Sequence, residues 1–135
     1  MSVKTRKFTT VTFYFPGSFF AEESSRETDT TDPQEIAKTA PEGSFCFSLR
    51  NYIEKTTTVD GEEFKKIEAD GEGGGRYYLG GTVYTLAEIK EKFSSKSSLI
   101  SNLESNGWPS AILCRTGNWQ PFTKKDRLLE LPLAA

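Results

Sequence analysis

Residues 76–88 read RYYLGGTVYTLAE and contain, within one short stretch, the signals of both kinds of secondary structure. The aromatic and β-branched residues on either side of Gly80-Gly81 favour two strands joined by a tight turn. Thr85 and Glu88 have the spacing of a capping box, in which each side chain accepts a hydrogen bond from the backbone amide of the other residue. The stretch therefore predicts two strands followed by a helix over residues 86–93.

Toward the N-terminus the expected elements are mainly strands. Residues 8–15, FTTVTFYF, are aromatic and β-branched, and strand character returns over residues 44–58. Asp60-Gly61 is a strong hairpin signal, which predicts a returning strand over residues 64–67. The glycine-rich residues 71–75 lack the Gly-Lys-Ser/Thr ending of a phosphate loop, so they predict a flexible hairpin loop.

Polar residues separate the first two of these strands. Residues 24–31 are charged or hydroxyl-bearing and predict a loop. Asp32 followed by Pro33 predicts the start of a short helix, which ends by residue 40 because Pro41 follows. Residues 21–42 are thus expected to form an acidic loop and a short helix.

The C-terminal part predicts one more helix and three short strands. The helix is expected over residues 98–106, with Gly107 ending it. The strands are expected over residues 111–115, 119–122 and 128–131, with a frayed tail over 132–135. The fold class is α+β: one domain over residues 1–135, with a bent antiparallel sheet and two or three short helices packed to one side.

Composition limits the partners. The net charge of −2 and the pI of about 5.3 give no basic surplus for binding polymeric nucleic acid. No apolar run reaches the roughly 20 residues that span a bilayer, and the polar N-terminus does not resemble a signal peptide, so we expect a soluble cytoplasmic protein. Cys46 and Cys114 lie in apolar surroundings and are expected to be reduced and buried.

The residue inventory favours binding without catalysis. The chain contains no histidine, so it lacks the commonest general base and metal ligand. The carboxylates of Glu22-Glu23 and Glu62-Glu63 point apart, because neighbours in an extended chain face opposite sides. We therefore expect no catalytic residue, no metal and no cofactor. The aromatic and arginine residues between 76 and 129 suit a flat, anionic small molecule.

Several segments of the C-terminal half resemble one protein family. They are residues 76–86 (RYYLGGTVYTL), 99–102 (LISN), 106–108 (NGW) and 116–122 (TGNWQPF). This pattern resembles the first class of anti-Thoeris sponge proteins, which are encoded by phages and bind a cyclic ADP-ribose isomer made by a bacterial TIR defence enzyme. The resemblance implies sequestration of the signal in the cytoplasm of the infected bacterium. It also implies a homodimer, which can assemble into a hexamer, with pockets between protomers and a separate site for cyclic oligonucleotides.

The same resemblance implies five ligand-binding residues. They are Arg50, Arg76 and Arg115 on phosphates, Phe93 stacked on adenine, and Asn102 from the helical part. Each has an ordinary alternative: a surface arginine, a packing aromatic or a solvated helix residue. Trp119 and Phe122 are expected to lie in the core.

Two other functions remain open from the sequence. The acidic residues 22–32 would suit docking on the basic surface of a host enzyme, which would make the chain a protein-binding inhibitor. The second alternative is an enzyme that cleaves a nucleotide, and the sequence favours this function less. Intact recovery of a bound nucleotide distinguishes a sponge from an enzyme, and a stable complex with a host protein identifies an inhibitor.

Overall fold

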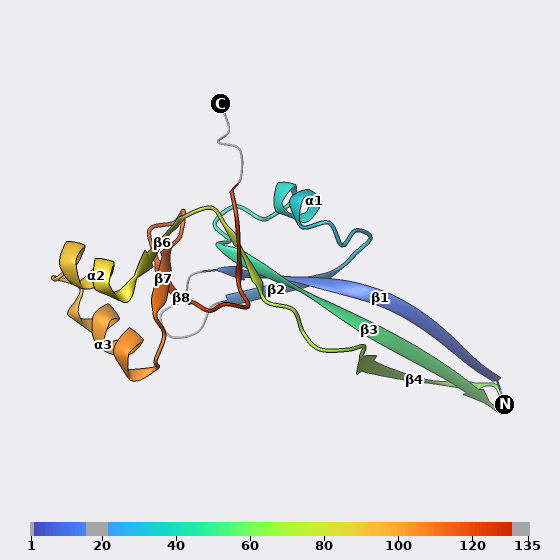
Figure 1. Ribbon diagram of the computed structural model, residues 1–135. Helices are drawn as coiled ribbons and strands as arrows, with labels where there is room; N and C mark the ends of the chain where they lie inside the picture. Colours follow the sequence, from blue (N-terminus) through green and yellow to red (C-terminus); the bar gives the residue numbers. More distant parts are fainter. Residues whose placement is uncertain (1, 16–21, 131–135) are drawn as a thin grey trace.

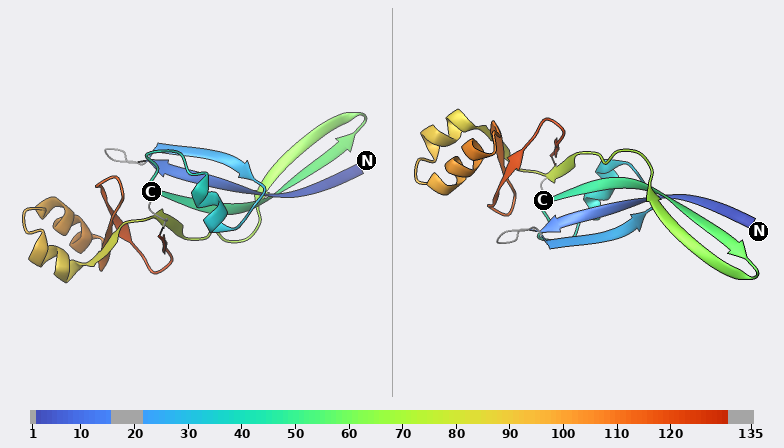
Figure 2. Two further views of the ribbon diagram at one scale, coloured as in Figure 1. Left: turned by 90° about the horizontal axis from the view of Figure 1, so that it is seen from above. Right: turned by 90° about the horizontal axis from the view of Figure 1, so that it is seen from below.

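The computed structural model describes residues 2–15 and 22–130, and it confirms the α+β fold class. The described elements are, in chain order, β1 (Ser2–Phe15), β2 (Glu22–Thr28), α1 (Pro33–Lys38), β3 (Cys46–Val59), β4 (Glu62–Ala69), β5 (Arg76–Leu79), β6 (Thr82–Thr85), α2 (Leu86–Lys92), α3 (Ser97–Ser105), β7 (Ser110–Leu113), β8 (Trp119–Phe122) and β9 (Arg127–Leu129). The molecule is elongated, with a strand extension at one end and α2 and α3 at the other (Figures 1 and 2).

The larger sheet is built on the long antiparallel pair of β1 and β3. Its strand order is β2-β1-β3-β5-β9, and β4 also pairs with β3. β5 and β4 share one edge of β3, because β5 pairs with residues 46–48 and β4 with residues 52–59. β5 and β9 are parallel, while the other pairs are antiparallel. The glycine-rich residues 71–75 therefore connect two successive neighbours of β3, and the prediction of a hairpin loop there is wrong.

The prediction of a loop over residues 24–31 is also wrong for its first part, because β2 occupies Glu22–Thr28. β2 is an edge strand, and its backbone pairs with residues 9–15 of β1. Its polar side chains find partners across the pair: the hydroxyls of Thr12 and Ser25 are 2.8 Å apart. An edge strand forms through backbone pairing and can carry polar side chains on both faces. The polar composition of these residues therefore did not indicate a loop. The expected tail over residues 132–135 lies outside the described residues.

The smaller sheet has the order β6-β7-β8 and carries α2 and α3. Gly80 and Gly81 both have positive φ, and they pass the chain from the larger sheet to the smaller one. The capping box is confirmed: Thr85 Oγ1 accepts from the Glu88 amide at 3.2 Å, and Glu88 Oε1 accepts from the Thr85 amide at 3.4 Å. The helix predicted over residues 98–106 and the three C-terminal strands are present within two residues of their expected bounds.

Three apolar clusters hold the molecule together. α1 packs Ile36 and Ala37 against the larger sheet, and α2 and α3 pack on the smaller sheet. The middle cluster joins the sheets, because it contains Cys46 and Tyr78 from one and Ile112 from the other. The two sheets therefore share the middle cluster. None of the helices in the described residues is both long and apolar enough to cross a lipid bilayer.

Candidate ligand-binding site

A pocket of about 230 Å³ lies where the two sheets meet, and we call it the junction pocket. It is lined by Gly74, Gly75, Arg76, Trp108, Pro121, Thr123, Lys125 and Asp126. These residues come from the start of β5, the segment after α3, the end of β8 and the segment before β9. Chain segments about 50 residues apart in sequence thus build one concave surface.

Asp126 fixes the wall of this pocket. Its Oδ1 accepts from the Arg76 amide at 3.1 Å, and its Oδ2 accepts from the Thr123 amide at 3.2 Å. Gly75 lies so close to the same segment that a Cβ atom there would be 1.7 Å from the Lys125 carbonyl oxygen. Only glycine allows this approach, so the wall depends on both the carboxylate and the missing side chain.

Trp108 supplies an aromatic surface. Gly107 has positive φ just after α3, and the Trp108 amide donates to the Leu103 carbonyl at 3.0 Å, which fixes the backbone where the ring emerges. The side chain is 37% exposed. Trp108 therefore has accessible ring surface at the pocket, although its sequence position between Gly107 and Pro109 favours a packing residue that closes the end of the helix.

Arg76 and Lys125 give the pocket its positive charge. The Arg76 guanidinium carbon is 5.4 Å from the centre of the Tyr14 ring. Burial lowers the pKa of Arg76. The neighbouring Tyr78 hydroxyl and the Asp126 carboxylate raise that pKa by a larger amount, so the net shift is upward. Asp126 accepts hydrogen bonds from two backbone amides, and within the described residues it forms no ion pair with Arg76 or Lys125.

The chemistry of this arrangement suits a planar anion. The face of the Trp108 ring can stack on a heterocyclic base, and the two cations can donate charge-assisted hydrogen bonds to phosphate oxygens. The volume is smaller than the roughly 300–1,000 Å³ of most small-molecule sites. The pocket therefore has room for only part of a dinucleotide-sized ligand.

Of the five residues implied by the resemblance, Arg76 lines the junction pocket. Arg50 lies on the same face of the larger sheet, because Arg76 pairs with Ser48 and Arg50 follows Ser48 by two residues. The Arg50 side chain is exposed, and its guanidinium carbon is 5.9 Å from the centre of the Tyr52 ring. The structure thus places two of the predicted arginines near one another on one sheet face.

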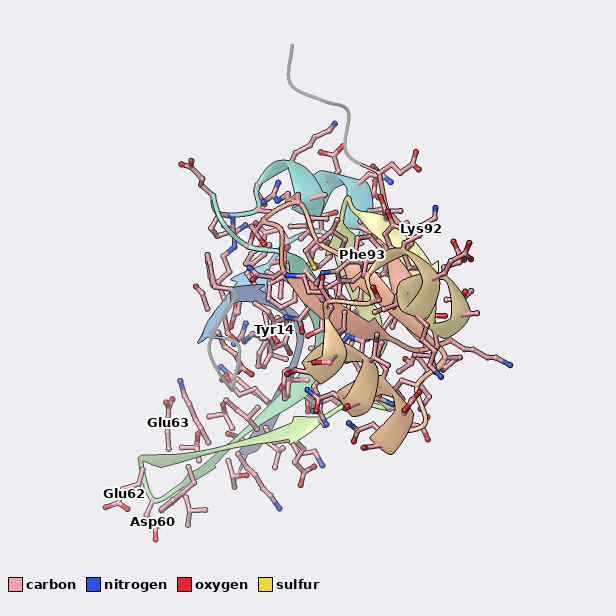
Figure 3. All side chains as sticks on the ribbon, turned by 90° about the vertical axis from the view of Figure 1, so that its left-hand side faces the viewer. Tyr14, Asp60, Glu62, Glu63, Lys92 and Phe93 are labelled. Carbon is pink, nitrogen blue, oxygen red and sulfur yellow. The ribbon has the colours of Figure 1, made fainter. Side chains whose placement is uncertain are left out.

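The other three predicted residues lie elsewhere. Arg115 Nε donates to the Ser44 carbonyl at 3.0 Å and so ties the smaller sheet to the segment before β3. Asn102 is exposed on α3. Phe93 lies beside α2 at the helical end of the molecule, as Figure 3 shows, and its ring is 5.0 Å from that of Trp119 and 5.2 Å from that of Tyr84. Phe93 thus packs on neighbouring aromatic residues, and Trp119 and Phe122, which were expected in the core, are partly buried and pack against two of the core clusters.

Sequence reasoning missed Lys125 and Asp126. Their neighbours are charged and give no periodic pattern, and their partners lie about 50 residues away. The available signal was the glycine run at 71–75, because a glycine that is followed by a strand often marks a close backbone approach. Interpreted as a flexible hairpin loop, the run does not reveal this contact.

The two cysteines are free and buried in the cluster between the sheets. Burial raises the pKa of Cys46 to about 12 and that of Cys114 to about 11, so both thiols are neutral near pH 7. They behave as small apolar side chains, as expected. Within residues 2–15 and 22–130, no group of three or more cysteine or acidic side chains is placed to hold a metal ion.

Comparisons of the chain with protein-family models, curated proteins and solved structures found no match.

Proposed function

We propose that the chain binds a small anionic nucleotide at the junction pocket and sequesters it without breaking its bonds. The observation that carries the proposal is the meeting of the Trp108 ring with Arg76 and Lys125 around one concave surface. The resemblance to the anti-Thoeris sponge proteins narrows the ligand to a cyclic nucleotide signal, with a cyclic ADP-ribose isomer as the first candidate. The biological role is then to block a bacterial antiphage response in the cytoplasm of the infected cell.

Approximate interaction energies support the enclosure of the ligand between two protomers. Each charge-assisted hydrogen bond contributes about 1.5–3 kcal/mol, and stacking on an aromatic ring about 1–3 kcal/mol. Two cations and one ring thus give at most about 9 kcal/mol, which is near micromolar affinity before the cost of association is subtracted. A sponge requires tighter binding, so we propose that a second protomer covers the part of the ligand that lies outside the pocket.

The experiment is calorimetric titration of the chain with a panel of cyclic nucleotides, followed by mass spectrometry of the compound that heating releases. We expect a cyclic ADP-ribose isomer to bind and to be recovered with its mass unchanged. Recovery of a cleaved product would identify an enzyme. If the chain binds no cyclic nucleotide of the panel, the proposed function is wrong.

Lys125→Ala and Lys124→Ala are a matched pair for locating the site. Both lysines are exposed neighbours, but only Lys125 lines the pocket. We expect Lys125→Ala to weaken binding by about tenfold, which corresponds to one charge-assisted hydrogen bond, and Lys124→Ala to leave affinity unchanged. Equal affinities in the two variants would place the ligand elsewhere on the chain.

A further inference from the structure

One end of the molecule is a three-stranded extension, which we call the arm. It consists of residues 2–8 of β1, residues 52–59 of β3, and β4. The pairing of β1 with β2 begins only at Thr9, so residues 2–8 of β1 leave one edge without a strand partner among the described residues. Every residue of β4 is exposed, and the arm projects away from the body of the protein (Figures 1 and 2).

The arm exposes an unusual amount of apolar surface. Five large hydrophobic side chains are well exposed in the described part of the chain, and four of them are on the arm: Val3 (59%), Val59 (39%), Phe64 (56%) and Ile67 (56%). Soluble proteins rarely expose apolar residues in such clusters unless the surface binds something. The clustering therefore marks the arm as an interaction surface.

The strand register sorts these residues onto two faces. Val3 pairs with Thr57 and Thr57 pairs with Phe64, so the three side chains form one row across the arm. Val59 lies two residues further toward the tip on the same face, which we call the Phe64 face. Ile67 is an odd number of residues from Phe64 along β4 and lies on the opposite face. Most of the exposed apolar surface is thus on the Phe64 face.

Charge on the Phe64 face changes sign along the arm. Toward the tip from the apolar row lies Glu62, which pairs with Val59. Toward the body lies the pair of Lys55 and Lys66, followed by Glu68, whose carboxylate is 3.0 Å from Lys66 Nζ and 3.8 Å from Lys55 Nζ. Two ammonium groups share one carboxylate there, so the body end is positive and the tip is negative.

Such a face is complementary to itself. Two copies can be related by a two-fold axis that runs parallel to the Val3–Thr57–Phe64 row, between the two faces. In this arrangement the apolar row of one copy packs on the same row of the other, and the strands of the two copies are antiparallel. Because the rotation places the tip side of one arm against the body side of the other, Glu62 of each copy lies opposite Lys66 of the other copy. We propose that the Phe64 face is a dimer interface that binds a second copy of this chain in this two-fold arrangement.

Geometry also sets the strength of this dimer. Strands rise about 3.3 Å per residue and lie about 4.8 Å apart, and the arrangement overlaps about five residues of three strands, so the overlapping faces cover on the order of 250 Å² on each copy. Interfaces that bury less than about 1,200 Å² in total are typically weak or transient. The dimer therefore forms in the micromolar range. It does not depend on the proposed ligand.

The first test compares two variants on opposite faces of β4. Phe64 and Ile67 have the same exposure, so Phe64→Ser and Ile67→Ser remove similar apolar surface. In sedimentation velocity over a micromolar concentration series, wild type and Ile67→Ser should dimerise alike, and Phe64→Ser should dissociate about tenfold more readily. Circular dichroism verifies that each variant is folded. A wild-type chain that stays monomeric throughout, or equal effects of the two variants, would overturn the proposal.

The second test uses the charges. Figure 3 shows Glu62 and Glu63 on opposite sides of the arm tip. Glu62→Lys and Lys66→Glu should each weaken the dimer, because each apposes like charges, whereas Glu63→Lys should not. An equimolar mixture of Glu62→Lys and Lys66→Glu should dimerise again, since the mixed pair has opposite charges at both contacts. A mixture that stays as monomeric as its components would refute the two-fold arrangement.

Discussion

Gly75 illustrates how one residue controls the candidate site. It has no side chain where the backbone passes the Lys125 carbonyl, and the next residue, Arg76, is held by the Asp126 carboxylate through its amide. Trp108 and Lys125 then complete a pocket wall that no single sequence motif contains. At this scale the shape of the pocket depends on the backbone approach as much as on the charged groups.

Gly75→Ala should destabilise the protein by about 2–4 kcal/mol, because the new methyl group meets backbone that cannot move aside without breaking the Asp126 contacts. The measurement is urea unfolding followed by circular dichroism. Gly73→Ala is the matched control, since its Cβ would meet nothing within 4 Å. That variant should change stability by less than about 1 kcal/mol. Similar stabilities for both variants would show that the close approach is relaxed in solution.

Among the elements, those with a local signal were predicted well. The capping box of Thr85 and Glu88 and the Asp32-Pro33 pair each place a helix start, because caps satisfy backbone amides within a few residues. Asp60-Gly61 forms the predicted two-residue hairpin turn, with positive φ at both residues. β2 was missed because its formation depends on pairing with β1, a partner that its own residues do not reveal.

Thr85→Ala should lower the stability of the protein by about 1 kcal/mol, because the Glu88 amide loses its acceptor at the start of α2. Thermal or chemical unfolding measures the loss. Thr82→Ala is a control on the same strand, where the exposed threonine caps no helix, and it should cost less than about 0.5 kcal/mol. An equal loss in Thr82→Ala would mean that strand preference, and not capping, determines the effect.

For the whole molecule, the cluster between the two sheets decides whether the chain behaves as one unit. Cys46 and Tyr78 pack with Ile112, and Tyr78 also donates its hydroxyl to the Pro121 carbonyl at 3.2 Å. Both contacts link the larger sheet to the smaller one. A shared core of this kind couples the unfolding of its two sides.

Unfolding should therefore be a single transition. Both tryptophans, Trp108 and Trp119, lie in the part of the chain that carries the smaller sheet, so their fluorescence reports on that part. Far-ultraviolet circular dichroism reports on the secondary structure of the whole chain. The two signals should give the same urea midpoint in wild type. A tryptophan signal that changes at lower urea would show that the smaller sheet unfolds independently.

The sequence by itself determined the α+β class, the helix starts, the main hairpin and the burial of both cysteines, because each depends on neighbouring residues or on local apolar pattern. Tertiary structure alone decided that the strands divide between two sheets, that Gly75 meets Lys125, and that Phe93 packs against Trp119. These features join segments distant in the chain. Their positions follow from strand pairing and shared burial, which are properties of the folded molecule and not of any one segment.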